Sequence, residues 1–170
     1  MRYLVETMVE YFQTLARYNT VANERIYAAC AALDDAQYRH RGAASFGSIH
    51  RTLNHIMVGD RIWMGRFEGV DSGITKLDAV LFEDLATLTQ ARREDDLRIE
   101  QYTARLTAET LASTLHYTNM AGREFDDSMA VLLGHMFNHQ THHRGQIHVM
   151  LSEAGVRGLS LDMHRIVNPG

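Results

Sequence analysis

Apolar residues recur about every 3.6 residues over long stretches of the chain, which is the spacing of an amphipathic α-helix. The pattern predicts four long helices, over residues 3–33, 45 or 48 to about 66, about 84–106, and 126 or 127 to 154. Ser45 or Ser48 is expected to cap the second helix, and Asp126 or Asp127 the fourth. These short polar side chains accept hydrogen bonds from the free backbone N–H groups at a helix start.

One connection between these helices is unusually long. Residues 69–73 interrupt the periodic pattern, and the next helix begins only near residue 83 or 84. An antiparallel pair of helices needs a shorter link, so this segment is predicted to cross over along the bundle. Elsewhere, Asp34 offers a cap for one extra turn, and Thr107 for a short helix through Leu111.

A small β-hairpin is predicted before the fourth helix, because residues 115–118 alternate in polarity and face residues 122–125 across a turn with glycine. The tail, residues 156–170, is too polar for a core helix, although Leu159, Leu161 and Met163 can dock on one. The sequence contains no parallel-sheet pattern and no repeat. It therefore predicts an all-α four-helix bundle that forms a single domain over residues 1–170.

Composition narrows the class of protein further. The chain has 170 residues, of which 45% are hydrophobic and 22% charged, as in globular domains with a core of their own. Its only proline is Pro169, which leaves the body free for long helices. The net charge of −4 gives no argument for a nucleic-acid or anionic-membrane partner. The only cysteine, Cys30, lies among alanines in a helical pattern, which indicates a buried structural thiol rather than a nucleophile.

The first residues lack the basic region, apolar run and cleavage site of a signal peptide. No stretch of about 18 apolar residues occurs anywhere in the sequence. We therefore expect a cytoplasmic protein without membrane spans.

Residues 92–96, at the middle of the third helix, are all charged. Such a run usually marks a face that is exposed to solvent. The alternative is that Arg92 or Asp95 faces a polar cavity inside the bundle.

The strongest chemical signal is a stripe of histidines on the fourth helix, where five of the ten histidines fall between His135 and His148. On an α-helix, His135 and His143 lie about 40° to either side of His139, together with apolar positions that should face the core. A buried imidazole needs a partner, because an unpaired polar group in a dry interior costs about 1–3 kcal/mol. A metal ion is one partner that several neutral imidazoles can share.

His139 and His143 form an i,i+4 pair that can reach one ion from one helix face. The third ligand has to come from another helix, and His55 is the natural candidate. Small residues such as Gly59 share its side of the second helix and leave room for a metal. His135 is the rival of His143, because His135 and His139 have the same spacing, while His142 is expected to lie behind the ligands. The alternative without metal is a set of core histidines that are hydrogen-bonded to protein groups.

Missing motifs limit the chemistry. The sequence has no HExxH and no Glu-x-x-His, which argues against a zinc-protease site and a di-iron carboxylate site. It also has no P-loop and no Gly-x-Gly-x-x-Gly or Gly-x-Ser-x-Gly motif. A three-histidine site with an open position can lower the pKa of a bound water or thiol. Activation of a thiol is attractive here because it does not need a strong protein base.

Three blocks of sequence resemble the DinB/YfiT-like superfamily. Residues 15–26, LARYNTVANERI, resemble the first-helix signature, although Val21 stands where an aromatic residue is common. Residues 49–55, IHRTLNH, with DRIW at 60–63, resemble the second helix with its first metal ligand. Residues 138–147, NHQTHHRGQI, resemble the fourth-helix motif and are the most specific of the three. The predicted hairpin and residues 159–162 also fit, so the resemblance spans nearly the whole chain.

The resemblance implies an up-down-down-up bundle with the long crossover between its second and third helices. It also implies a divalent metal, held by His55, His139 and His143 with water completing the shell, while His135 takes a neighbouring role. The metal is expected to be nickel or zinc, with iron or manganese as alternatives. Members of the superfamily are frequently homodimers. Characterised relatives include S-transferases and maleylpyruvate isomerases that use bacillithiol, mycothiol or glutathione.

Three functions therefore compete. The first is a metal-dependent transferase that activates a low-molecular-weight thiol for attack on a small electrophile. The second is a metal-dependent hydrolase that uses metal-bound hydroxide, with Asp95 or a tail residue as the base. The third is a stress-related protein that binds a metal or a ligand without catalysis. The expected partners are a small-molecule substrate and a second copy of the chain, without nucleic acid or membrane.

Overall fold

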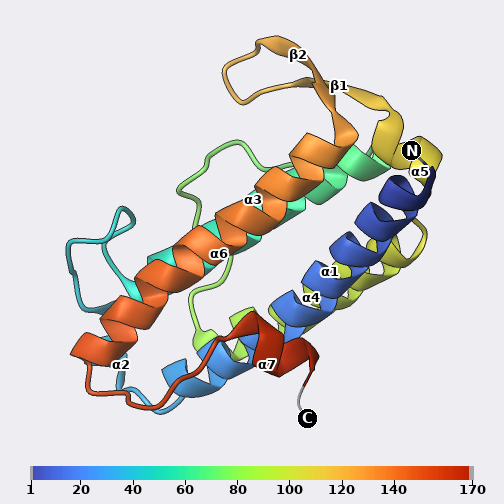
Figure 1. Cartoon of the computed structure of the whole chain (residues 1–170). Coiled ribbons are helices and arrows are strands. Elements are labelled where there is room, and N and C mark those ends of the chain that lie inside the picture. The colour runs from blue at the N-terminus through green and yellow to red at the C-terminus, as the bar shows by residue number, and fades with distance from the viewer. Residues whose placement is uncertain (1, 169–170) are drawn as a thin grey trace.

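Four long helices form a bundle in the computed structural model, which describes residues 2–168 and side chains from residue 7 onward (Figure 1). They are α1 (Arg2–Cys30), α3 (Ile49–Glu68), α4 (Leu85–Ala104) and α6 (Met129–Glu153). The shorter elements are α2 (Asp35–Arg39), α5 (Ala108–Ala112), β1 (Thr114–Thr118), β2 (Glu124–Ser128) and α7 (Met163–Val167). The predicted all-α bundle is confirmed, while Pro169 lies outside the described residues.

Contacts between residues of different helices show the direction of each helix. Helices α1 and α6 run one way, and α3 and α4 run the other way, which is the expected up-down-down-up order. The order follows from contacts at successive positions along each pair: Gln13–Thr103 and Asn23–Asp96, Asp60–Arg92 and Glu68–Arg98, His55–His139 and Trp63–His135, and Phe12–Phe137 and Asn19–Arg144.

The helix starts agree with the sequence analysis except at the fourth long helix. The hydroxyl of Ser48 accepts from Arg51 N and caps α3, which settles the choice between Ser45 and Ser48. Asp84 caps α4 in the same way. The prediction that Asp126 or Asp127 caps α6 is wrong, because both residues belong to β2 and α6 begins after Ser128. The second strand of the hairpin therefore lies later than the predicted residues 122–125, and Leu115 pairs with Asp127 in its register.

The long connection between α3 and α4 runs along the bundle, as predicted for a crossover, and is the green trace between these helices in Figure 1. The buried side chain of Asn54 on α3 forms hydrogen bonds to the backbone of this connection with both its oxygen and its nitrogen. Its Oδ1 accepts from the backbone N–H groups of Leu81 and Phe82 at 2.8 and 2.9 Å, and its Nδ2 donates to the Phe82 carbonyl. The crossover is thus fixed at a defined height on α3.

The core consists of two apolar clusters, one around Ile26, Leu53 and Ile147 and the other around Phe12, Ile99 and Leu133. Polar side chains from all four long helices are also buried, and we call them the polar layer: Asn19, Asn23, Asp60, Arg92, Asp96, Gln140 and Arg144. Arg92 donates to Asp60 at 2.5 Å and pairs with Asp96 at 3.0 Å. Arg92, Asp60 and Asp96 thus neutralise one another, as burial requires, while Arg144 donates to the side-chain amide oxygens of Asn19 and Asn23.

The polar layer corrects the interpretation of residues 92–96 as a solvent-exposed face. Arg93 and Glu94 are exposed, but Arg92, Asp95 and Asp96 are buried. Arg92 is bound within an ion-pair cluster, and Asp95 accepts from Arg61 at 2.7 Å. Sequence periodicity could not show this, because partners for these charges lie on other helices.

The remaining segments agree with the sequence analysis. Asp34 caps α2 and Thr107 caps α5. Leu159 and Leu161 of the tail pack on the first apolar cluster, and the Leu161 carbonyl accepts from the Tyr18 hydroxyl. Within residues 2–168, no helix has the length and apolar character needed to cross a membrane.

Cys30 is 1% exposed, and burial raises the pKa of its thiol to about 12. The thiol is therefore protonated at neutral pH and is not a nucleophile. This agrees with the structural role predicted for Cys30.

Candidate metal centre

The structure brings together the three histidines that the sequence analysis selected. His55 comes from α3, and His139 and His143 come from successive turns of α6. One ring nitrogen of each lies within 4.8 Å of the corresponding nitrogen of the other two. The Nε2 atoms of His55 and His139 are 2.9 Å apart. Two imidazoles that bind one metal at about 2.0–2.1 Å have their nitrogens about 2.9–3.4 Å apart, so this spacing suits a shared ion.

Gly59 provides the space for His139. A Cβ atom on Gly59 would lie 2.7 Å from Cε1 of the His139 ring, well inside van der Waals contact. The ring of His139 therefore occupies the volume that a side chain on α3 would fill. The sequence analysis expected this space to leave room for a metal, whereas in the structure the His139 ring fills it.

Hydrogen bonds fix the tautomer of two of the imidazoles. Nδ1 of His55 lies 2.8 Å from the Leu77 carbonyl oxygen on the crossover, and Nδ1 of His143 lies 2.8 Å from Oε1 of Gln146. Because both oxygens can only accept, the proton of each neutral ring is on Nδ1 and the lone pair is on Nε2. Metal-binding histidines are commonly held in this manner by an acceptor behind the ring.

Burial keeps the three imidazoles neutral. It lowers the pKa of His139 to about 3, and repulsion from protonated forms of His143 and His55 adds to the effect. Burial also lowers the pKa values of His55 and His143, although their hydrogen bonds oppose the shift. Neutral imidazoles are the form that binds a metal, so the donor set fits a divalent transition-metal ion.

The other histidines of the stripe lie beside this cluster. His135 is exposed, its ring contacts Trp63 at 5.3 Å between centroids, and it is not among the three clustered histidines. His142 is also exposed, and its Nε2 lies 3.2 Å from Nε2 of Gln146, the residue whose other amide atom holds His143. His142 therefore lies behind the ligands, where the sequence analysis placed it.

Three groups around the ligands were not predicted: the Leu77 carbonyl, the Gln146 amide and the ring of Phe46. Gln146 lies on the histidine stripe three residues after His143, so its spacing was a usable signal. The Leu77 carbonyl is a backbone group whose position depends on the path of the crossover. Phe46 lies in the loop before α3, where no periodicity indicates the direction of a side chain.

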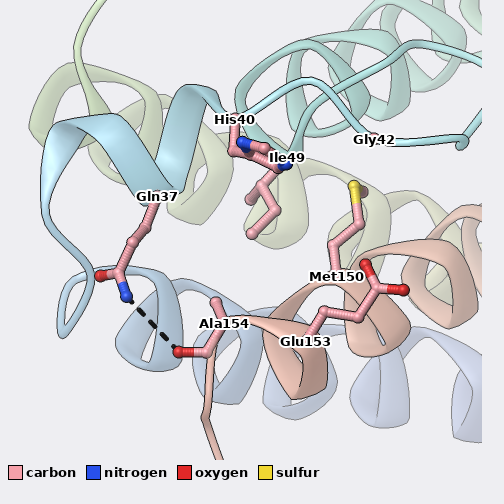
Figure 2. Close-up of a pocket in the computed structure, with 7 residues that line it drawn as sticks. All are labelled: Gln37, His40, Gly42, Ile49, Met150, Glu153 and Ala154. Atoms are coloured by element: carbon pink, nitrogen blue, oxygen red, sulfur yellow. Dashed lines mark hydrogen bonds between the residues drawn. The ribbon is translucent and has the colours of Figure 1, made fainter.

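A separate cavity of about 320 Å³ lies at the C-terminal end of α6 (Figure 2). Its lining comes from α2, the loop that follows it, the start of α3 and the end of α6: Gln37, His40, Gly42, Ile49, Met150, Glu153 and Ala154. None of the three clustered histidines lines it, so it is distinct from the candidate metal centre.

Together, the up-down-down-up bundle and the three converging imidazoles define a helical protein with a possible metal site between α3 and α6. Comparison with known proteins assigns the family: the sequence model of the DinB family matches residues 7–168, and the chain belongs to this family. Protein DinB of Bacillus subtilis is 31% identical over 163 residues, which cover 91% of this chain and 92% of that protein.

Solved structures show the same fold. A DinB-like protein of Bacillus cereus superposes with a TM-score of 0.60 at 21% identity, covering 82% of this chain and 89% of that one. The DinB-like protein YjoA of Bacillus subtilis also gives 0.60 at 21% identity, covering 91% and 96% of the two chains. At this identity the likeness supports the fold alone.

Proposed function

We propose that the protein is a metal-dependent enzyme that activates a low-molecular-weight thiol for transfer to a small electrophile. The observation that carries this proposal is the cluster of three neutral imidazoles, which among the described residues includes no carboxylate. A metal held by three imidazoles lowers the pKa of a bound thiol, so a strong protein base is not needed. Family membership supports the scaffold and leaves the reaction open.

The residues of this chain have distinct roles in the proposal. His55, His139 and His143 would hold the metal, with nickel or zinc as the expected ion. The Leu77 carbonyl and Gln146 hold the protons of His55 and His143 on Nδ1, which leaves the lone pair of each ring on Nε2.

The hydrolase alternative has less support. It requires a base near the metal, for which the sequence analysis suggested Asp95 or a residue of the tail. In the structure Asp95 accepts from Arg61 at 2.7 Å and is thereby engaged in an ion pair.

The first test measures metal content by elemental mass spectrometry in the native protein and in His55→Ala, His143→Ala and His135→Ala. We expect about one divalent ion per chain in the native protein and in His135→Ala, and loss of the ion in the other two variants. Loss in His135→Ala with retention in His143→Ala would place the site one turn earlier on α6. The absence of metal in the native protein, even after reconstitution, would contradict the proposal.

The second test measures conjugation of bacillithiol, mycothiol and glutathione to small electrophiles by the metal-loaded protein. We expect acceleration with at least one thiol, and loss of that acceleration in His55→Ala and after removal of the metal by a chelator. Binding of metal without acceleration for any thiol would favour a protein that binds metal without catalysis.

A further inference from the structure

Phe46 lies against two of the three clustered histidines. Its half-buried ring is stacked on His55, with 3.7 Å between ring centroids and an interplanar angle of 19°. The same ring meets His143 edge-on at 5.5 Å and 68°. One side chain from the loop before α3 thus contacts ligands from both α3 and α6.

The loop that carries Phe46 is held in a closed form by its own backbone. Gly42 N donates to the Gly47 carbonyl, and Gly47 N donates to the Ala44 carbonyl, both at 2.7 Å. Gly47 has a φ of +80°, a conformation that favours glycine over residues with a Cβ. The backbone on both sides of Phe46 is therefore ordered around a turn that directs its ring toward the histidines.

Gln146 connects this loop to the candidate metal ligands. Its Nε2 donates to the hydroxyl of Ser45 at 3.4 Å, while its Oε1 accepts from Nδ1 of His143. Ser45 is the residue directly before Phe46. The orientation of His143 and the position of the Phe46 loop therefore depend on the same amide group.

We propose that Phe46 is a cap on the metal centre, whose ring has to leave His55 and His143 before a metal ion can enter or leave. This inference rests on the proposed function, since it requires that the three histidines bind a metal. In this proposal the ring keeps its contacts with the imidazoles of His55 and His143 both before and after metal binding. Removal of the ring therefore speeds entry and exit together and changes the equilibrium affinity little.

Aromatic contacts of this kind contribute about 0.5–1.5 kcal/mol, which corresponds to about a two- to tenfold change in a rate. We expect Phe46→Ala to raise both the rate of Zn²⁺ loading and the rate of Zn²⁺ release by about this factor. The dissociation constant should change by less than about threefold. Phe46→Leu retains an apolar side chain without the aromatic face, so its rates should fall between those of Phe46→Ala and the native protein.

The experiment uses the full chain and follows Zn²⁺ release to an excess of a chromophoric chelator, and Zn²⁺ loading of the metal-free protein, by stopped-flow absorbance. The matched control is Phe125→Ala. Phe125 is also a half-buried phenylalanine, but it lies on β2, where its ring stacks on Tyr117 at 5.6 Å. This control should leave both rates unchanged.

The outcomes separate the cap from the proposed function. Faster loading and release in Phe46→Ala, with unchanged affinity and an inert control, would support the cap. Loading and release rates in Phe46→Ala equal to those of the native protein would contradict the capping role of Phe46 and leave the proposed metal site unaffected. Weaker affinity caused by faster release alone would also overturn it, because Phe46 would then orient the ligands of the bound metal. A native protein that takes up no Zn²⁺ would overturn the proposed function and the cap with it.

Discussion

Gly59 lies on α3 one turn after His55, against the ring of His139. A Cβ at this position would approach Cε1 of His139 to 2.7 Å and Nδ1 to 3.1 Å. Because the neighbouring rings of His143 and His135 confine His139, the ring cannot move away without leaving the cluster. At the scale of single residues, the space left by a glycine is therefore as important to the candidate site as the ligands themselves.

The first prediction concerns this space. We expect Gly59→Ala to weaken Zn²⁺ binding by at least about tenfold, because displacement of one ligand costs about 1.4 kcal/mol or more. Isothermal titration calorimetry of the metal-free protein measures the change. The control is Gly145→Ala on α6, where an added Cβ meets nothing within 4 Å. It should keep Zn²⁺ affinity and stabilise the protein by up to about 1 kcal/mol through helix propensity. Equal affinity in the two variants would contradict the role given to Gly59.

At the scale of elements, the crossover is part of the candidate site. Its Leu77 carbonyl fixes the tautomer of His55, and its position depends on the hydrogen bonds of Asn54 to Leu81 and Phe82. A connection that looks like a passive link in the sequence thus orients one of the three clustered histidines. Both attachments of the crossover start from neighbouring residues of α3, because Asn54 directly precedes His55.

The second prediction follows from this attachment. Asn54→Ala leaves the N–H groups of the half-buried residues Leu81 and Phe82 without their acceptor, and each unpaired group costs up to about 1–3 kcal/mol. We expect a loss of about 2–4 kcal/mol in the free energy of unfolding in urea. Hydrogen exchange should also become faster in residues 69–84.

The matched control for this prediction is Asn138→Ala, at an exposed position on α6. It should change the free energy of unfolding by less than about 0.5 kcal/mol. Unchanged hydrogen exchange in the crossover of Asn54→Ala would show that other contacts hold this segment.

At the scale of the whole molecule, the polar layer joins all four long helices. Asp96 on α4 accepts from Asn19 and Asn23 on α1 at 3.0 and 2.9 Å, while Arg92 extends the network to Asp60 on α3. These contacts require each helix to have one axial position and one rotation relative to its neighbours. The layer therefore specifies how the helices are aligned, while the two apolar clusters supply most of the buried surface.

The third prediction concerns this layer. Arg92→Leu leaves the carboxylates of Asp60 and Asp96 buried without their cation, which typically costs about 3–5 kcal/mol. We expect a loss of that size in the free energy of unfolding, measured by urea denaturation. The neighbouring Arg93 is exposed, so Arg93→Leu should change the free energy by less than about 0.5 kcal/mol. Similar values for the two variants would mean that the buried ion pairs are not important for stability.

The sequence by itself determined the elements and the ligand types. Periodicity located the four long helices because an amphipathic helix repeats its apolar face locally, and the caps at Ser48 and Asp84 act within one turn. The i,i+4 spacing of His139 and His143 placed two imidazoles on one face for the same reason. Such features depend only on residues that are near one another in the chain.

Features that depend on contacts with other segments of the chain could be seen only in the tertiary structure. It showed that Asp127 pairs across a hairpin, that Arg92 is buried, and that the Leu77 carbonyl and Phe46 contact His55. A charged residue can be buried only if a partner from another helix neutralises it, and no local pattern reveals that partner. The sequence thus selected the histidines, and only the packing of α6 on α3 and of the crossover along α3 brought their ring nitrogens within 4.8 Å of one another.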